Sequence, residues 1–189
     1  MFLDKVITFT LGTVFLLVLA CQGPSEEQKT ALQSRRNTGL LHQPAFWDYA
    51  ASSNMLQVEI AKVVAEKGST QQARSMALEA VAFHGNALKE LQQLVRHHQK
   101  IQLPDSLGGA DLGLVLEFKL LEGEELDTHY QEFVLSTHHA QLSRYEEALL
   151  KAEEPKTRDW LMNMRAHLQE ETSNVGSLAT TEDVVEEVL

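Results

Sequence analysis

Residues 70–100 read TQQARSMALEAVAFHGNALKELQQLVRHHQK, and their pattern indicates the fold class. Apolar side chains recur there at intervals of three and four residues around His84, which is the spacing of one face of an α-helix. The apolar positions on this face are Ala77, Ala80, Val81, Leu88, Leu91 and Val95. The stretch is therefore predicted to form one long amphipathic helix, with Ser69 as its N-terminal cap.

Helical patterns continue on both sides of this stretch, and no strand-like alternation persists between them. Pro44 is a favourable first-turn residue for the helix before it, which Gly68 stops. Gly123 and Pro155 mark later boundaries. The predicted long helices cover residues 44–67, 70–100, 124–152 and 155–173, and a short helix covers 111–121. Four long helices with short first and last turns predict an all-α four-helix bundle, with the extra short helix between the second and third long ones.

Length and charge limit the possible partners. The chain has 189 residues and a net charge of −11, which disfavours nucleic acid as a partner. Residues 44–175 are expected to form the one folded domain. Residues 21–43 are polar and are interpreted as a flexible tether. Residues 176–189 are interpreted as an acidic tail that forms one short, loosely attached helix.

Cys21 is the only cysteine, and it follows an apolar run of about 15 residues, shorter than the roughly 20 that a spanning helix needs. The run and the sequence Val18-Leu19-Ala20-Cys21 resemble a bacterial lipoprotein signal. This resemblance implies that residues 1–20 are removed and that Cys21 carries a lipid anchor. The protein would then lie in the cell envelope, on the periplasmic face, with Gln22 favouring the outer over the inner membrane. A plain transmembrane anchor remains the alternative.

Three histidines lie on the inward stripes of three different predicted helices. His84 is at the centre of the stripe described above. The same helical offsets around His138 give Gln131, Val134, Leu135, Leu142, Tyr145 and Leu149. His167 follows Trp160 by two turns, with Glu171 one turn later. All three imidazoles are therefore expected to point towards the bundle axis.

The three imidazoles are also expected at similar heights. With a rise of about 1.5 Å per residue, His84, His138 and His167 fall within about 7 Å of one another along the axis. Glu59 flanks the apolar stripe of the first helix, about 10 Å nearer the first interhelical turn. It is the fourth candidate member of the group.

Two interpretations of this group remain open. Neutral imidazole is a common ligand of zinc, copper and iron, so His84, His138 and His167, together with Glu59, are candidate ligands of a transition metal. The alternative is a buried polar layer whose imidazoles bond to one another, to Tyr145 or to water, and such a layer must be fully satisfied. A ferritin-type di-iron site is not indicated, because no glutamate stands three residues before any of these histidines.

Several motifs together carry a resemblance to a known family. They are the helix Met55–Ala65, His84 seven residues before Leu91, His138 seven residues before Tyr145, the pair His167-Leu168, and the loop at Leu103-Pro104. From Phe46 to about Val175 the chain resembles a bacterial family of secreted proteins, domain of unknown function 4142, whose members are labelled outer-membrane proteins. The resemblance implies a ferritin-like fold and no particular activity. Family members usually have aspartate directly before the first two histidines, where this chain has Phe83 and Thr137.

The first functional hypothesis is a non-enzymatic, lipid-anchored envelope protein that binds a protein or another envelope component. It depends on the signal, the tether and the absence of a phosphate loop, nucleophile elbow or paired acidic site. The second hypothesis, of a different class, is a metal-binding or metal-dependent redox protein that uses the three histidines.

Overall fold

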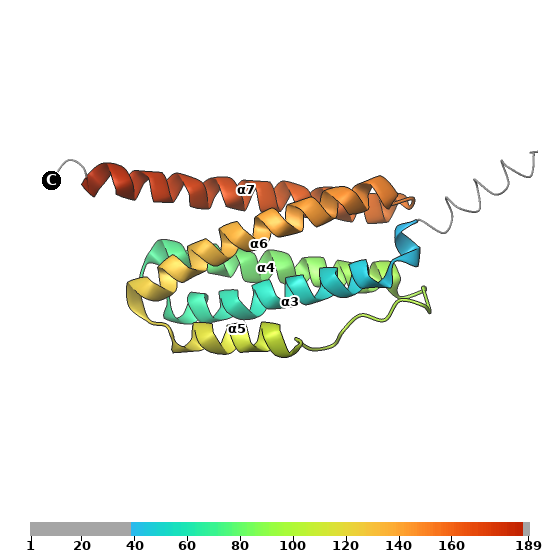
Figure 1. Ribbon diagram of the computed structural model, residues 1–189, viewed down its shortest axis with the longest axis horizontal. Coiled ribbons are helices and arrows are strands. Elements are labelled where there is room, and N and C mark those ends of the chain that lie inside the picture. The colour runs from blue at the N-terminus through green and yellow to red at the C-terminus, as the bar shows by residue number, and fades with distance from the viewer. Residues whose placement is uncertain (1–38, 187–189) are drawn as a thin grey trace, which may run out of the picture. The chain divides into compact units, whose positions relative to one another are not determined.

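The computed structural model describes residues 39–186, with side chains as far as Val175. Regular structure in this part of the chain is entirely helical, which confirms the prediction of an all-α protein (Figure 1). Its elements are η1 (Leu40–His42), α3 (Pro44–Lys67), α4 (Gln71–Val95), α5 (Gly109–Leu120), α6 (Gly123–Lys151) and α7 (Pro155–Glu186). The predicted signal, Cys21 and most of the predicted tether lie outside the described residues.

The long helices form two hairpins that pack together as a helical bundle. Helix α3 packs against α4, and α6 packs against α7. Contacts between α3 and α6 and between α4 and α7 close the bundle, while α5 lies along α3 (Figure 1). A backbone bridge joins Gly68 to Gly123, so α6 begins where α3 ends. Helices α3 and α7 therefore run in one direction and α4 and α6 in the other.

The ends of α3 agree with the prediction. Pro44 occupies its first turn, where the missing N–H of proline costs no helical hydrogen bond. At the other end the N–H of Gly68 donates to the carbonyl of Val64 and closes the helix. The fold begins slightly before Pro44, because Leu40 is buried and its carbonyl accepts a hydrogen bond from Trp47 Nε1 at 3.0 Å.

Both ends of α4 differ from the prediction. Its N-cap is Thr70, whose hydroxyl accepts from the N–H of Ala73, whereas Ser69 donates its hydroxyl to Asp127. The helix ends at Val95, five residues earlier than expected. The polar residues that follow have no apolar face to bury, and Ile101 is buried only after the chain has turned.

Helix α7 is longer than predicted, continuing past Ser173 to Glu186. The most helix-weakening residue in this extension is Gly176, and a single glycine costs a helix only about 1 kcal/mol. No helix in the described part of the chain combines the length and the apolar content that crossing a membrane would take.

The core contains two apolar clusters with a polar layer between them. One cluster includes Trp47, Leu91, Tyr145 and Leu168, and the other includes Ile60, Ala77, Val134 and Val175. Along every long helix, a buried polar residue separates the members of the two clusters. These polar residues are Asn54 and Gln57 on α3, His84 on α4, His138 and Gln141 on α6 and Glu171 on α7, and the half-buried His167 lies one turn before Glu171 in the same layer.

Candidate metal centre

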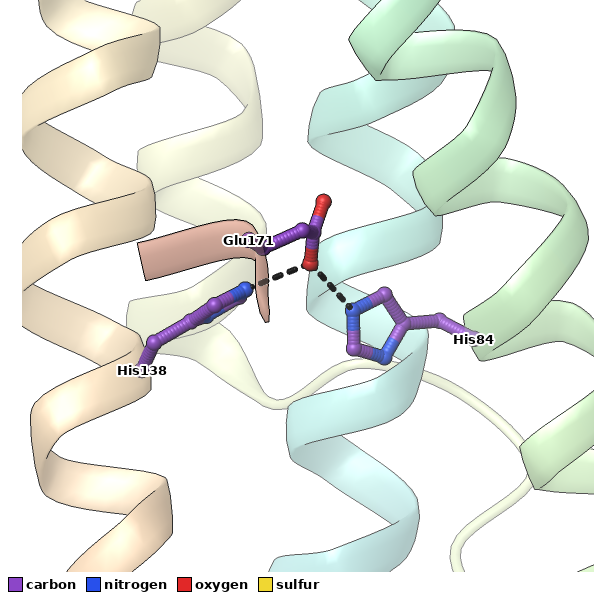
Figure 2. A group of neighbouring side chains, drawn as sticks. All are labelled: His84, His138 and Glu171. Carbon is purple, nitrogen blue, oxygen red and sulfur yellow. Dashed lines mark hydrogen bonds and ion pairs between the residues drawn. The ribbon is translucent and has the colours of Figure 1, made fainter. Parts of the chain in front are cut away.

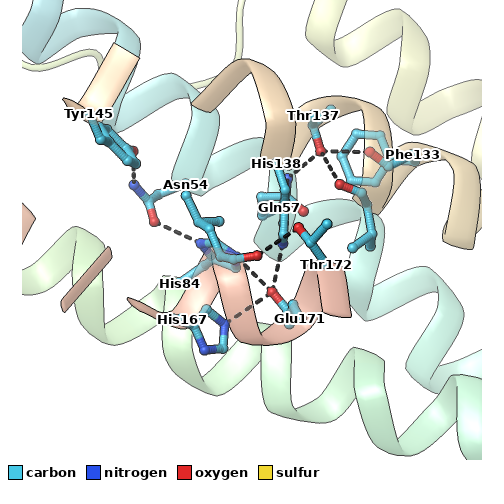
Figure 3. A network of polar contacts seen from close by, with 12 residues as sticks. Asn54, Gln57, His84, Phe133, Thr137, His138, Tyr145, His167, Glu171 and Thr172 are labelled. Carbon is cyan, nitrogen blue, oxygen red and sulfur yellow. Dashed lines mark hydrogen bonds and ion pairs between the residues drawn. The ribbon is translucent and has the colours of Figure 1, made fainter. Parts of the chain in front are cut away.

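Four side chains of the polar layer converge between α4, α6 and α7 (Figures 2 and 3). His84 comes from α4 and His138 from α6, while His167 and Glu171 lie one turn apart on α7. The ring centroid of His84 is 6.0 Å from that of His138 and 5.7 Å from that of His167. These separations confirm the prediction that the three histidines share one layer.

One carboxylate oxygen of Glu171 is the common neighbour of the three rings. From its Oε2, the Nε2 atom of His138 is 2.7 Å away, that of His167 is 3.0 Å away and that of His84 is 3.9 Å away. Candidate ligand atoms of His84, His138 and Glu171 lie within 4.8 Å of one another. Ligand atoms around a tetrahedral zinc ion are about 3.3 Å apart, so only small movements would be needed to enclose an ion.

A hydrogen bond to Asn54 on α3 determines which ring nitrogen of His84 carries the proton. Asn54 Nδ2 donates to the carbonyl of Ala50 at 2.7 Å, which orients the amide and leaves Oδ1 as an acceptor. His84 Nδ1 lies 2.9 Å from this oxygen and is therefore the nitrogen that carries the proton. Burial lowers the pKa of His84 to about 3, against an opposing effect of Glu171, so the ring is neutral at pH 7. Its Nε2 is thus a buried lone pair, and no described residue is a hydrogen-bond partner for it.

In His138 the proton is on Nε2, the nitrogen that faces Glu171, whereas in His84 it is on Nδ1. The Thr137 hydroxyl donates to the Phe133 carbonyl at 2.6 Å and accepts from Gln57 Nε2 at 2.8 Å. The same Gln57 nitrogen lies 3.5 Å from Nδ1 of His138, which makes Nδ1 an acceptor in the neutral ring. The ring proton is then on Nε2, which donates to Glu171 at 2.7 Å.

Glu171 is an ionised carboxylate in a largely dry environment. Burial opposes its ionisation, but the hydrogen bond from His138 and the neighbouring His167 ring outweigh that effect and hold the pKa of Glu171 well below its usual range. Of the three Nε2 atoms around it, that of His84 makes no hydrogen bond to any described residue, and that of His167 lies 3.0 Å from the carboxylate without good hydrogen-bond geometry. A cation among these groups would contact the carboxylate and both nitrogens at once.

His167 is the member of the group nearest to solvent. Its side chain is 18 % exposed, whereas those of His84 and His138 are fully buried. The ring stacks on Phe83 with the centroids 3.4 Å apart. Both residues line a groove of about 440 Å³ between α4 and α7. The groove brings solvent to the outer edge of the site.

The structure places the fourth predicted member, Glu59, outside this group. The Glu59 side chain is 42 % exposed and pairs with Lys62 at 2.6 Å. The carboxylate that meets the histidines is Glu171, whose position one turn after His167 on the same stripe was the available sequence signal. Asn54 and Gln57 were not predicted to take part, although their spacing of three residues on the buried face of α3 indicates a shared environment.

Comparison with known proteins agrees with the resemblance seen in the sequence. The chain belongs to the family described as domain of unknown function (DUF4142), whose model matches residues 26–178. No curated protein and no solved structure matches the chain.

Proposed function

For this member of the family, we propose that the bundle binds one divalent transition-metal ion, with His84, His138 and Glu171 as ligands and His167 as the fourth. The observation that carries the proposal is Nε2 of His84, a buried lone pair without a partner that faces an ionised carboxylate 3.9 Å away. Leaving a buried polar atom unpaired costs about 1–3 kcal/mol. A bound cation would remove that cost and the repulsion between the lone pair and the carboxylate.

The alternative, a buried polar layer without a metal, accounts less well for the buried polar atoms that have no hydrogen-bond partner. Such layers stabilise a core when each polar atom has a partner. In the described residues of this layer, Nε2 of His84 and the Oε1 atoms of Gln57 and Gln141 have none, and Nε2 of His167 has only its 3.0 Å approach to Glu171. An ion bonded to both histidines would satisfy the two nitrogens, and metal binding at Nε2 of His138 would move the ring proton to Nδ1, where the Gln57 oxygen can accept it.

The ligand set favours particular metals. Imidazole nitrogen suits zinc, copper, iron and nickel, whereas magnesium and calcium prefer sites made entirely of oxygen. With three imidazoles and one carboxylate bound, a tetrahedral ion has no open position. The proposal is therefore metal binding or storage, and not metal-dependent catalysis.

Zinc titration tests this proposal. The full chain, purified in a mild detergent and stripped of metal, should bind one zinc ion and melt at a higher temperature in its presence. At a free zinc concentration of 100 times Kd the gain is about 2.7 kcal/mol. Glu171→Gln and His84→Gln should abolish the shift, while His139→Gln, an exposed histidine beside the site, should leave it unchanged. Absence of a shift in the parent protein would refute metal binding.

We also propose a ferritin-like arrangement of the four long helices. Two antiparallel hairpins joined by one long crossover characterise such folds. The segment between α4 and α6, which contains α5, has the position of that crossover, and the helix directions agree with it. The candidate centre differs from a ferritin di-iron site because a single carboxylate, Glu171, meets the histidines.

A lipid on Cys21 is proposed to hold this domain at the periplasmic face of the outer membrane. The support is the sequence of residues 1–22, and the net charge of −11 disfavours an alternative role on nucleic acid. Labelled palmitate should enter the parent protein in cells and not Cys21→Ser. A mature protein that still begins at Met1 would contradict the anchor.

A second candidate function, binding of an envelope protein, is favoured by the outer face of α5. Leu112, Leu116 and Leu120 follow one another at one-turn intervals and are 48 %, 52 % and 83 % exposed. A photo-crosslinking residue at position 116 should give one discrete adduct in cells. The adduct should disappear when Leu112 and Leu120 are replaced by serine, and its persistence would refute this surface.

A further inference from the structure

Helix α3 supplies no ligand to the proposed metal site. Two of its side chains nevertheless contact the Nδ1 atoms of the histidine ligands (Figure 3). Asn54 and Gln57 are each only 1 % exposed and lie three residues apart. Asn54 bonds to Nδ1 of His84, and Gln57 lies against Nδ1 of His138. Both amides thus meet the ring nitrogen that faces away from Glu171.

We propose that Asn54 and Gln57 are positioning residues that determine which nitrogen each histidine presents to the metal. This inference depends on the metal-binding function proposed above. A histidine ligand usually donates its second ring N–H to an oxygen acceptor, which fixes the orientation of the ring and raises its basicity. Asn54 and Gln57 are the residues that can supply this acceptor to His84 and His138.

Asn54 already holds His84 in the form that binds a metal. Its amide nitrogen is committed to the carbonyl of Ala50 at 2.7 Å and approaches the hydroxyl of Tyr145 at 3.4 Å. Its oxygen is therefore directed at His84 Nδ1 and accepts the ring proton at 2.9 Å. No change at Asn54 is needed when an ion binds.

Gln57 directs its amide nitrogen at Nδ1 of His138, which suits the metal-free form of the ring, so the amide must reorient when a metal binds. When Nε2 of His138 bonds to a metal, the ring stays neutral and its one proton moves to Nδ1. That N–H then needs an acceptor. Gln57 Oε1 is buried beside the ring without a partner, and a half-turn of the amide places it against Nδ1. The Thr137 hydroxyl, which now donates to Phe133, can rotate to donate to the same oxygen.

Substitutions of Asn54 and Gln57 should therefore change the zinc affinity in different ways. Asn54→Leu and Gln57→Leu remove the acceptor and should each weaken zinc binding about 10- to 100-fold. Asn54→Asp keeps an acceptor for His84 and should restore binding. Gln57→Glu offers only acceptors, which favours the metal-bound form of His138, so it should bind zinc at least as tightly as the parent. Gln141→Leu, which removes an equally buried amide with no hydrogen bond to the histidines in the described structure, is the control.

Two-bond ¹H–¹⁵N spectra of the histidine-labelled full chain read the position of each ring proton directly. Without metal, His84 should carry it on Nδ1 and His138 on Nε2. With zinc, both rings should carry it on Nδ1. The inference would be overturned, with metal binding left intact, if Asn54→Leu and Gln57→Leu kept the zinc affinity of the parent. The opposite proton positions in the metal-free protein would overturn it as well. Predicted proton positions in a parent protein that binds no zinc would instead refute the metal site and the positioning role with it.

Discussion

At the scale of single residues, the buried neutral state of His84 makes stability depend on pH. Its pKa falls from 6.5 to about 3 on folding, because burial disfavours the charged ring. Between these values the unfolded chain binds a proton that the folded protein does not, so stability is greatest above pH 6.5 and decreases below it. From about pH 6.5 to 5 the metal-free protein should lose about 1.5 kcal/mol through this residue.

Urea unfolding of metal-free parent protein and of His84→Gln, across this pH range, measures the effect. The comparison uses the slope with pH, so a lower absolute stability of the variant does not affect it. The variant should lack about 1.5 kcal/mol of the pH-dependent loss. Parallel curves would show that His84 is not held neutral by the fold.

Residue-scale features of the site were only partly predictable from the sequence. Histidines on apolar stripes are conspicuous, and the approximate heights of all three followed from the helical rise alone. Glu59 was named as the fourth member of the group and Glu171 was not, because both flank a stripe and only the rotation of each helix decides which carboxylate faces inward. Asn54 and Gln57 resemble ordinary helical polar residues until their partners are known.

At the scale of elements, Asp127 joins the turn between α3 and α4 to the start of α6. Its carboxylate accepts from the N–H and hydroxyl groups of both Ser69 and Thr70, at 2.8–3.0 Å. Hydrogen bonds to a charged group contribute about 1.5–3 kcal/mol, so Asp127→Ala should lower the free energy of unfolding by about 2 kcal/mol. Glu124→Ala, which removes an exposed acidic residue in the first turn of α6, should change it by less than about 0.5 kcal/mol. Equal effects of the two substitutions in urea unfolding would contradict this role.

Two glycines should respond oppositely to the same substitution. Gly123 has a φ of 64°, where a side chain is strained, so Gly123→Ala should destabilise the protein by about 1 kcal/mol. Gly85 lies inside α4, and a methyl group there would meet nothing within 4 Å. Gly85→Ala should therefore stabilise the protein by about 0.5–1 kcal/mol through helix propensity. Thermal melts of the two variants measure both signs, and a gain at position 123 would contradict the backbone argument.

Element boundaries were predictable where one residue determines them. Pro44, Gly68 and Pro155 each limit the backbone locally, and helices begin or end at all three. The end of α4 depends on a distant cause, the burial of Ile101 against the core, and local sequence does not reveal it. For α7, residues 176–189 were interpreted as a separate acidic tail, but nothing in the backbone requires the helix to end at Ser173.

At the scale of the whole molecule, the polar layer divides one core into two apolar clusters. Each long helix contributes to both clusters and carries polar residues between them, so the layer connects all four helices. A bound ion would join α4, α6 and α7 at the one level where apolar packing is interrupted. We therefore expect the proposed metal to complete the core at this level.

X-ray absorption at the zinc edge of the zinc-loaded full chain tests that claim most directly. The first shell should contain nitrogen and oxygen at about 2.0–2.1 Å, with scattering from imidazole rings that decreases by one ring in His84→Gln. A shell of oxygen atoms alone, or imidazole scattering that is unchanged in His84→Gln, would contradict it.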